Sequence, residues 1–429
     1  MQDFSDFGTV RRRRGSGSWL THMIVAVLAA GVAVAIVIGF FRPASGGFQP
    51  RIGAVPAPPA SAAPVAGGQQ DIVAKVSPGL VLINTALQYN GEAAAGTGMV
   101  INSDGLVLTN NHVIENSTKI TATVITTGKT YPATVIGYDK TADVALIRLQ
   151  GATGLHTVPI GNSAAVKTGE AVLALGNAEG TGAIIPAGGQ VTGLDKTITA
   201  SDEAATDNTE TLHGMIQINA GIVPGDSGGP LSTSTGQVIG VDTAGDSTST
   251  GQQPPEGFAI PIDTALSVAR QIAAGQASST VSIGYPPFAG IFTGSGTSSN
   301  PRTQAQQQEQ QNGFGDGTGG LGGFNGFGGS GSSPVCYTSN TNLAVPTAIA
   351  PVGSGTLIDG TICGSPAAAA GMTAGSVITA INGQAAGSPA NLASTLTRFK
   401  PGDTISVTWV SPAGQQTTST VHLTAGPPH

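Results

Sequence analysis

Gly225-Asp226-Ser227-Gly228-Gly229-Pro230 is the most informative stretch of this chain. The glycines around its serine carry no Cβ, so the backbone can adopt positive-φ turns that direct two N–H groups at one point. A serine presented in this way is suited to act as an acyl-transfer nucleophile. The stretch predicts Ser227 as the nucleophile. It also predicts an oxyanion hole formed by Gly225, Asp226 and Ser227, with the N–H groups of Gly225 and Ser227 as donors.

A general base and an acid that orients it are expected upstream. His112 follows the apolar run 106–108, and Asp143 stands at the head of another apolar run, 144–147. Both runs are typical of strands. His112 would accept the proton of Ser227 and return it to the leaving amine, and Asp143 would hold the imidazole in the required tautomer. Asp139 is a rival acid, but it lies among turn-forming residues and is expected to be an exposed turn residue.

The order His, Asp, Ser along the chain is that of the chymotrypsin-like double β-barrel, and it differs from the orders of subtilisins and α/β-hydrolases. Between residues 81 and 241, short β-branched runs are broken by Gly, Asn, Asp and Pro, which favours barrels. Residues 71–276 are long enough for two six-stranded barrels that share a cleft. Apolar residues at helical spacing predict a helix over 262–274. The fold class is therefore expected to be mainly β.

Several motifs resemble those of the HtrA (Deg) serine proteases. They are Ser103-Asp104-Gly105 and the stretches 109–114, 142–146, 224–231 and 257–261. This resemblance implies an ATP-independent endopeptidase that cleaves unfolded or damaged envelope proteins and assembles as a homotrimer. Asp226 departs from the family pattern, which usually has asparagine at this position.

The specificity pocket is less well defined by the sequence. The position six residues before the serine, where trypsin-like enzymes place an acid, is Gly221. A pocket lined by Gly221, Ile222, Thr243 and Ala244 would accept a small or medium apolar side chain with broad preference. The alternative is that Ile222 is a core residue.

A second module is expected over residues 284–425. The stretches 364–372 and 375–383 resemble a PDZ domain of α+β class, with a helix over 391–399 beside the groove that binds peptide C-termini. Its carboxylate-binding loop would be Phe288, Ala289, Gly290 and Ile291, although these residues could equally be linker. Residues 294–337 would interrupt the module. They are rich in Gly, Gln and Ser and are expected to be disordered.

The chain has two cysteines, Cys336 and Cys363, both within this second module. In an oxidising compartment they could form a disulfide, and two free buried thiols are the alternative. The sequence shows no metal-ligand spacing, phosphate loop or cofactor motif, so neither a metal nor a cofactor is expected.

The N-terminal region predicts a membrane anchor. Residues 1–22 carry four consecutive arginines, residues 23–41 contain no charge, and residues 42–70 are rich in Pro and Ala. Nineteen apolar residues suffice for one transmembrane helix with a cytoplasmic N-terminus. A cleaved signal peptide is the alternative. Residues 1–42 carry five Arg and two Asp (+3), whereas the remainder carries 12 Lys and Arg against 22 Asp and Glu (−10), which gives no nucleic-acid-binding footprint.

These observations lead to one main expectation. It is a single-pass cell-membrane serine endopeptidase whose protease and PDZ domains are extracytoplasmic. The alternative is a non-proteolytic envelope chaperone or peptide-sensing adaptor on the same fold.

Overall fold

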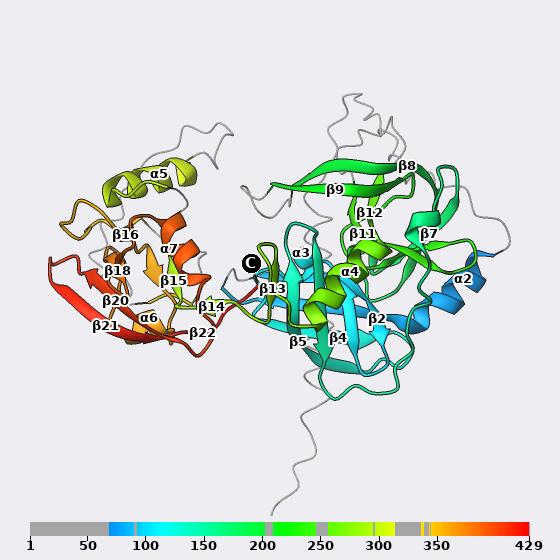
Figure 1. The fold of residues 1–429 in the computed structure, drawn as a ribbon, viewed down its shortest axis with the longest axis horizontal. Coiled ribbons are helices and arrows are strands. Elements are labelled where there is room, and N and C mark those ends of the chain that lie inside the picture. The colour runs from blue at the N-terminus through cyan, green and yellow to red at the C-terminus, as the bar shows by residue number, and fades with distance from the viewer. Residues whose placement is uncertain are drawn as a thin grey trace, which may run out of the picture. The chain divides into compact units, whose positions relative to one another are not determined.

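The computed structural model describes residues 68–89, 92–201, 209–245, 256–294, 297–313, 336–338, 343 and 345–428 (Figure 1). The expected cytoplasmic tail, the expected membrane span 23–41 and nearly all of the expected linker lie outside these residues. Among the described helices, none is both long enough and apolar enough to cross a membrane.

The first barrel follows a short N-terminal helix α2 (Gln69–Val76) and a 3-10 turn η1 (Ser77–Gly79). Its strands are antiparallel and lie in the order β13-β5-β4-β1-β2-β3-β6, and an additional β5–β6 pairing joins the ends of six of them. The strands are β1 (Leu80–Leu87), β2 (Glu92–Asn102), β3 (Leu106–Thr109), β4 (Lys119–Val124), β5 (Thr130–Asp139), β6 (Val144–Leu149) and β13 (Val281–Ile283).

Alternation of buried and exposed residues explains why these segments are strands. In β4 the side chains of Ile120, Ala122 and Val124 are buried, and in β5 Tyr131, Ala133 and Val135 are buried. Every second residue of a strand faces the same side, so these residues fill the barrel interior.

The second barrel is closed, in the order β10-β11-β12-β9-β8-β7. Its strands are β7 (Ala171–Gly176), β8 (Ile185–Ser201), β9 (Thr209–Ile218), β10 (Pro230–Thr233), β11 (Val238–Gly245) and β12 (Gly257–Pro261). Short 3-10 turns lie before and after β7, η2 (Ser163–Ala165) and η3 (Ala178–Gly180). Two barrels of six strands, as the sequence predicted, are therefore present.

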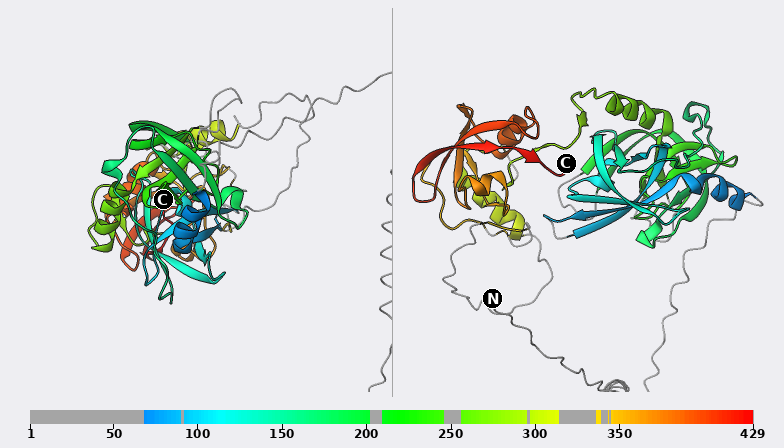
Figure 2. Two further views of the ribbon diagram at one scale, coloured as in Figure 1. Left: turned by 90° about the vertical axis from the view of Figure 1, so that its right-hand side faces the viewer. Right: turned by 90° about the horizontal axis from the view of Figure 1, so that it is seen from below.

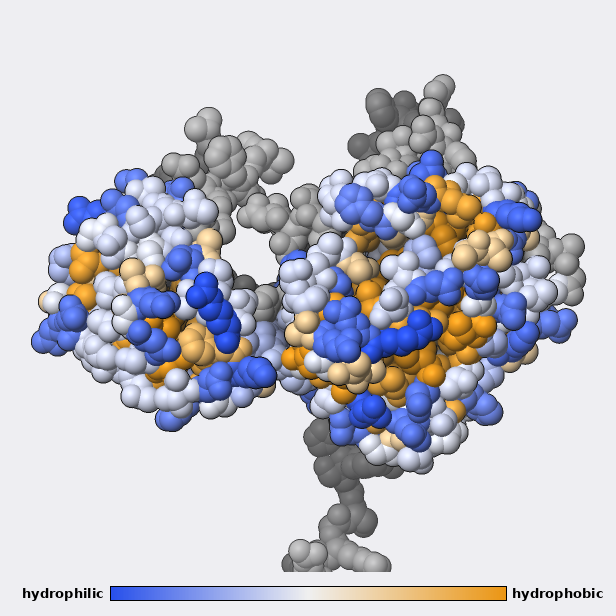
Figure 3. Space-filling view, viewed as in Figure 1, coloured by the Kyte–Doolittle hydropathy of each residue, from blue (hydrophilic) through white to orange (hydrophobic). Residues whose placement is uncertain are grey.

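Helix α4 (Ile262–Ala273) confirms the helix predicted after the second barrel (Figure 2). Its buried face consists of Ile262, Ala265, Ala269 and Ile272, which belong to an apolar cluster shared by both barrels. The face shown in Figure 3 is largely hydrophilic, and apolar residues gather near α4.

The second module has its own core. Strands β16 (Thr356–Leu357), β18 (Val377–Ile381), β20 (Thr404–Val410) and β21 (Gln416–His422) form one sheet, in which β19 (Gln384–Ala385) pairs with β18. Two small ladders pair β14 (Pro287–Phe288) with β22 (Thr424–Ala425) and β15 (Ile291–Phe292) with β17 (Gly360–Thr361).

Helices α6 (Pro366–Ala369) and α7 (Pro389–Leu396) complete this module. Each has a serine N-cap, Ser365 or Ser388, whose side chain accepts a backbone N–H of the first turn. The β18–β19 hairpin turns at Asn382 and Gly383, with φ of 48° and 78°. A tight two-residue hairpin turn requires a positive φ at both of its central residues.

The inserted segment differs from the expectation of disorder. Residues 301–313 form helix α5 (Pro301–Gly313), which lies against β16. The amide of Gln304, which is 4% exposed, donates to the carbonyls of Ser298 and Gly355 and accepts from the N–H of Leu357. A glutamine-rich sequence has few apolar side chains to bury, but this buried amide fixes the helix through hydrogen bonds instead. Residues 314–335 lie outside the described residues.

Candidate active site

The turn that carries Ser227 depends on its glycines for space as well as for conformation. Gly225 has a φ of 96°, and a Cβ there would lie 2.2 Å from the carbonyl oxygen of Asn177. Gly228 has a φ of 84°, and a Cβ there would lie 2.1 Å from the carbonyl oxygen of Thr97. A side chain at either position would therefore displace the turn.

Thr97 attaches this turn to the first barrel. Its N–H donates to the carbonyl of Ser227 (2.9 Å), and its hydroxyl donates to the carbonyl of Gly225 (2.8 Å) and accepts from the N–H of Asn177 (2.9 Å). The carbonyl of Thr97 accepts from the hydroxyl of Thr109 (2.7 Å). Thr97 was not predicted as a site residue, because its only signal in the sequence is its position between two glycines of β2.

His112 and Asp143 form a direct pair. Short helix α3 (Asn111–Ile114) carries His112, whose Nδ1 lies 2.9 Å from Oδ2 of Asp143. The backbone N–H of His112 donates to Oδ1 of Asp143 (3.0 Å), and the Asn110 amide donates to the carbonyl of Asp143 (2.9 Å). Asp143 is 1% exposed and the His112 side chain 32% exposed, so the carboxylate is enclosed while the imidazole reaches solvent.

Asp139 is not part of this cluster, but the expectation that it is exposed is wrong. It is 5% exposed, and its carboxylate accepts from the N–H of Ala142 (3.1 Å) and the hydroxyl of Thr280 (2.8 Å). Both hydrogen bonds join chain segments within the first barrel. Asp139 is therefore a structural residue.

Thr243 links Ser227 to Asp143. The hydroxyl of Thr243 donates to Oδ2 of Asp143, and the carbonyl of Thr243 accepts from the Ser227 hydroxyl (3.2 Å). One residue of β11 therefore contacts both the predicted acid and the predicted nucleophile, and the predicted base contacts the acid. Thr243 was expected to line the substrate pocket, and its contact with Asp143 was not foreseen.

The backbone of the turn distinguishes the three residues predicted for the oxyanion hole. The N–H of Asp226 donates to the carbonyl of Val223 (3.0 Å), so it is not available as an oxyanion donor. Within the described part of the chain, no hydrogen bond from the N–H of Gly225 or Ser227 is seen. These two groups remain free to bind an oxyanion, whereas Asp226 has another role in the turn.

The predicted pocket residues have mixed placements. Ile222 is buried in the apolar core of the second barrel. Its side chain lies so close to Gly257 that a Cβ added there would clash with it. This placement agrees with the alternative that Ile222 is a core residue. Gly221 is half-buried, and the side chain of Ala244 lies outside the described residues. The specificity pocket stays a prediction.

Two buried carboxylates lie at the serine turn, one in the turn itself and one in the neighbouring strand β11. Asp226 is 3% exposed and Asp242 is fully buried. Burial raises the pKa of Asp226 to about 6, partly offset by the hydrogen bond from the Val223 N–H. Burial also raises the pKa of Asp242 well above its usual value, and the neighbouring charge of Asp226 raises it further.

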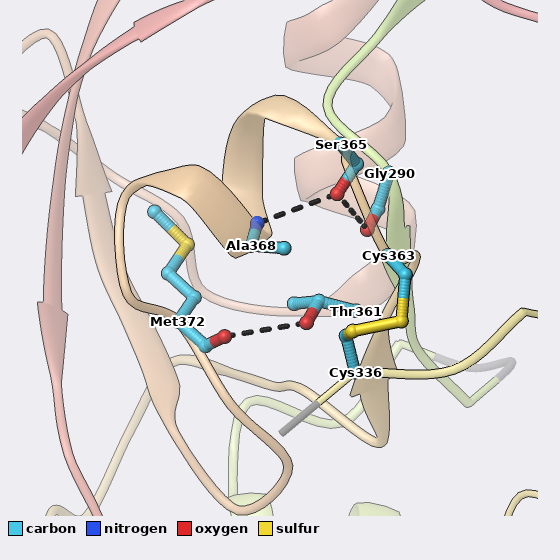
Figure 4. Close-up of a disulfide and its surroundings, with 7 residues drawn as sticks. All are labelled: Gly290, Cys336, Thr361, Cys363, Ser365, Ala368 and Met372. Carbon is cyan, nitrogen blue, oxygen red and sulfur yellow. Dashed lines mark hydrogen bonds between the residues drawn. A yellow bond between two sulfur atoms is a disulfide. The ribbon is translucent and has the colours of Figure 1, made fainter. Parts of the chain in front are cut away.

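The predicted carboxylate-binding loop is built around Gly290 (Figure 4). Gly290 has a φ of 74°, and a Cβ there would lie 2.1 Å from that of Ser365. Its carbonyl accepts from the Ile362 N–H (2.9 Å) and the Ser365 hydroxyl (3.2 Å). These four predicted residues are therefore an ordered part of the module and not a linker.

The two cysteines form the disulfide that the sequence had left open. Cys336 and Cys363 are bonded, with their Cα atoms 4.9 Å apart (Figure 4). Beside the bond, Tyr337 donates its N–H to the carbonyl of Thr361 and accepts from the N–H of Cys363 (both 2.8 Å). The disulfide thus fixes the end of the inserted segment to the residues directly after β17, the strand that pairs with β15.

Comparisons with known proteins agree with this geometry. Residues 96–241 match the family described as a trypsin-like peptidase domain. Serine protease PepD of Mycobacterium tuberculosis is 33% identical over 296 residues, which cover 65% of this chain and 62% of PepD. A probable periplasmic serine endoprotease DegP-like of Chlamydia pneumoniae is 41% identical over 175 residues, covering 40% of this chain and 32% of that protein.

The chain thus spans less than two thirds of either relative. A solved structure of the HtrA-type protease AlgW with a tripeptide aligns over 84% of this chain and 98% of AlgW, at 24% identity. Its TM-score is 0.42, so this likeness says nothing about function. The sequence matches and the two-barrel fold agree: the chain contains a trypsin-like peptidase domain, and it is similar to serine proteases such as PepD and the DegP-like endoprotease over part of their length.

Proposed function

We propose that the protein is a serine endopeptidase in which Ser227 is the nucleophile, His112 the general base and Asp143 the orienting acid. The observation that carries this proposal is the hydrogen-bonded path from His112 through Asp143 and Thr243 to the Ser227 hydroxyl. The buried carboxylate of Asp143 contacts the partly exposed imidazole of His112. It also contacts Thr243, whose carbonyl accepts the hydroxyl of Ser227. A carboxylate with a purely structural role would not be shared in this way.

The chemistry follows from these contacts. Asp143 binds Nδ1 of His112 and so holds the tautomer whose Nε2 carries no proton and can accept that of Ser227. The serine oxygen then attacks the scissile carbonyl, and the oxyanion binds to the N–H groups of Gly225 and Ser227. His112 returns the proton to the leaving amine, and a water molecule hydrolyses the acyl-enzyme by the same route.

The orientation of Asp143 is itself strongly determined. Besides the imidazole, its carboxylate accepts from the His112 N–H and the Thr243 hydroxyl. Preorganised donors of this kind need no rearrangement when charge develops on the imidazole. Each of them therefore supports catalysis through His112.

The second module is proposed to be a PDZ domain that binds peptide C-termini. The carbonyl of Gly290 accepts a hydrogen bond from the N–H of Ile362, and the carbonyl of Phe292 accepts one from the N–H of Asp359. Both donors lie directly beside β17. In an antiparallel strand the residue between these two acceptors directs its N–H and carbonyl to the opposite edge, so Ile291 offers a free edge for a peptide strand. The free edge directly follows the positive-φ turn at Gly290, where a carboxylate could bind.

The substrates are proposed to be unfolded or damaged envelope proteins, with membrane attachment through residues 23–41. Two observations support this: the relative from Chlamydia is a probable periplasmic serine endoprotease, and residues 23–41 of this sequence form an uncharged apolar run. A homotrimer is the assembly that the family resemblance suggests.

Hydrolysis of an unfolded protein tests the proposal. Full-length wild type in detergent should cleave reduced casein, and Ser227→Ala should not. Ser234→Ala is the matched control, because Ser234 lies on an exposed turn five residues after the pair Gly228-Gly229 and should leave cleavage unchanged. Casein that is bound by the wild type but stays intact would instead identify a peptide-binding adaptor.

A further inference from the structure

Asp226 and Asp242 differ from every other carboxylate that the structure describes. Oδ1 of Asp226 and both side-chain oxygens of Asp242 are buried without a well-formed hydrogen bond, although the backbone N–H of Leu175 approaches Asp242 and opposes the rise in its pKa. The other Asp226 oxygen accepts from the N–H of Val223 (3.0 Å). By contrast, the equally buried carboxylate of Asp143 accepts three hydrogen bonds or contacts. Buried polar groups normally find partners, so this pair requires an explanation.

The two residues are held close to each other by backbone hydrogen bonds. The N–H of Gly229 donates to the carbonyl of Asp226, and the N–H of Asp242 donates to the carbonyl of Gly229 (both 2.8 Å). The carbonyl of Asp242 accepts from the N–H of Gly228 (2.8 Å). Asp226 also lies against Gly176, where a Cβ would be 2.4 Å from Oδ1. Neither residue can therefore withdraw from the other without moving the serine turn.

No positive charge faces this pair among the described residues of the elements around it. Strands β7 and β10 carry no titratable residue, and the acids of β2 and η3, Glu92 and Glu179, are exposed. The His112–Asp143 pair is joined to Thr243, the residue that follows Asp242 in β11. Two carboxylates without a cation cannot both be ionised at low cost in a buried site.

We propose that Asp226 and Asp242 share one proton at neutral pH, and that this protonated pair positions the turn whose Gly225 and Ser227 N–H groups bind the oxyanion. One carboxyl donates its proton to an oxygen of the other, which supplies a partner for Oδ1 of Asp226 and for one of the two Asp242 oxygens; the Leu175 N–H lies beside Asp242 as well. Asp226 acts through the turn and not on the substrate, so it is a positioning residue. This inference rests on the proposed peptidase function.

The expected pH dependence has a defined sign. Both carboxyls bind protons more tightly in the folded protein than in the unfolded chain, so their contribution to stability is complete at low pH and is lost as the pH rises. The first proton leaves as the pH passes about 6, the raised pKa of Asp226. The last leaves at higher pH, and the two carboxylates then repel each other. The pair titrates as a unit, so the steps belong to both residues.

Activity should therefore decline on the alkaline side. Deprotonation of His112 raises kcat/KM as the pH increases, and loss of the shared proton lowers it again. Above that second pKa, kcat/KM should fall about tenfold per pH unit. In Asp242→Asn the amide can donate to Oδ1 of Asp226, so no proton is needed and the alkaline decline should disappear.

The test compares kcat/KM between about pH 5 and pH 10 for the full-length wild type, Asp242→Asn, Asp226→Asn and Asp195→Asn, a range that begins about one unit below the first step and extends well into the alkaline region. Asp195 is exposed and has a φ of 54°, which asparagine adopts readily, so Asp195→Asn is the matched control and should follow the wild type. Asp226→Asn retains the acceptor for Val223 and provides a second variant if Asp242→Asn does not fold.

A second readout does not depend on activity. The thermal unfolding midpoint of Ser227→Ala should fall as the pH rises, and the fall should be smaller in Ser227→Ala/Asp242→Asn. The shared proton would be overturned if the unfolding midpoints of Ser227→Ala and Ser227→Ala/Asp242→Asn fell equally with pH. It would also be overturned if the pH profiles of kcat/KM were the same for the wild type and all three Asp→Asn variants. Neither result would contradict the peptidase function. An alkaline decline that moves with the concentration of K⁺ or Ca²⁺ would place a cation in the pair and also overturn the proposal. Failure of all variants to cleave any substrate would contradict the peptidase function, and the unfolding comparison would still test the pair.

Discussion

Thr243 and Asp143 lie 100 residues apart in the chain, yet the hydroxyl of Thr243 donates directly to the carboxylate of Asp143. Through its carbonyl the same residue accepts the hydroxyl of Ser227. One residue of β11 in the second barrel therefore contacts both the proposed acid of the first barrel and the proposed nucleophile. This residue joins the two barrels at the proposed active site.

Removing the Thr243 hydroxyl should reduce activity without removing the triad. Thr243→Val keeps the shape of the side chain but leaves one acceptor of a buried carboxylate unpaired, at a cost of about 1–3 kcal/mol. We expect kcat/KM to fall about ten- to a hundredfold, measured on a peptide substrate. Thr121→Val, a change in strand β4 where the hydroxyl contact is exposed, should leave kcat/KM unchanged. Equal activity of the two variants would show that Thr243 does not support Asp143.

The two buried acids of the first barrel should behave differently. Asp143→Asn should lower kcat by about 10⁴-fold, because the amide favours the wrong tautomer of His112. Asp139→Asn should lower the unfolding midpoint through its weakened hydrogen bonds to Ala142 and Thr280, with a much smaller effect on kcat. Circular dichroism melts and steady-state kinetics on the same preparations separate the two effects. A larger loss of kcat in Asp139→Asn would reverse the assignment of the acid.

Gly225 tests whether the turn needs space or only a positive φ. Gly225→Ala should lower kcat/KM at least about 10²-fold, because the new Cβ meets the Asn177 carbonyl and displaces an oxyanion donor. Gly402→Ala is the matched control: Gly402 has a φ of 95°, close to the 96° of Gly225, but no atom lies near its added Cβ. Only the strain of the backbone is shared, so the control should remain active.

Some of this site could be predicted from the sequence, and the reason lies in which signals are local. The glycines around Ser227 and the strands beside His112 and Asp143 each report on their own backbone. Their order along the chain then indicates the fold. Thr97 and Thr243 act through contacts with residues up to 128 positions away, which no local pattern encodes.

Burial of polar groups was the other point that the sequence did not reveal. Asp139 has the neighbours of an exposed turn residue, yet Thr280 and the first residue of β13, Val281, cover it. Helix α5 has the composition of a disordered segment, yet one of its own residues, Gln304, has a buried side-chain amide. In both cases a distant segment supplies the hydrogen-bond partner.

The second module should lose stability as the pH rises. Burial raises the pKa of Asp359 to about 7, although the Gln308 amide and the Gly294 N–H partly oppose this. The folded module therefore holds the proton more tightly than the unfolded chain does, so the stabilisation is complete at acidic pH and lost as the pH passes about 7. The unfolding midpoint of this module should fall between pH 5 and pH 8, about one to two units on either side of that value, in the wild type. It should change less in Asp359→Asn.

Asp403→Asn serves as the control for this prediction, because Asp403 is exposed on the same module. It should keep the pH dependence of the wild type. A fall of the same size in Asp359→Asn would show that another group is responsible.

The disulfide should stabilise the second module. It closes a loop between residues 27 positions apart, for which the chain-entropy treatment gives roughly 3–4 kcal/mol. Reduction, or the double substitution of Cys336 and Cys363 by serine, should lower the unfolding midpoint of this module but not that of the peptidase barrels. Differential scanning calorimetry with and without dithiothreitol measures both. A midpoint that reduction leaves unchanged would contradict this role.

The most direct test of the central claim is to identify the residue that a fluorophosphonate probe modifies. The probe reacts with a serine that a neighbouring base activates and that an oxyanion hole faces, which is the arrangement inferred here. Mass spectrometry of the labelled full-length protein should place the adduct on Ser227, and His112→Ala should abolish it. A wild-type protein that stays unlabelled, or an adduct on a different serine, would contradict the proposed active site.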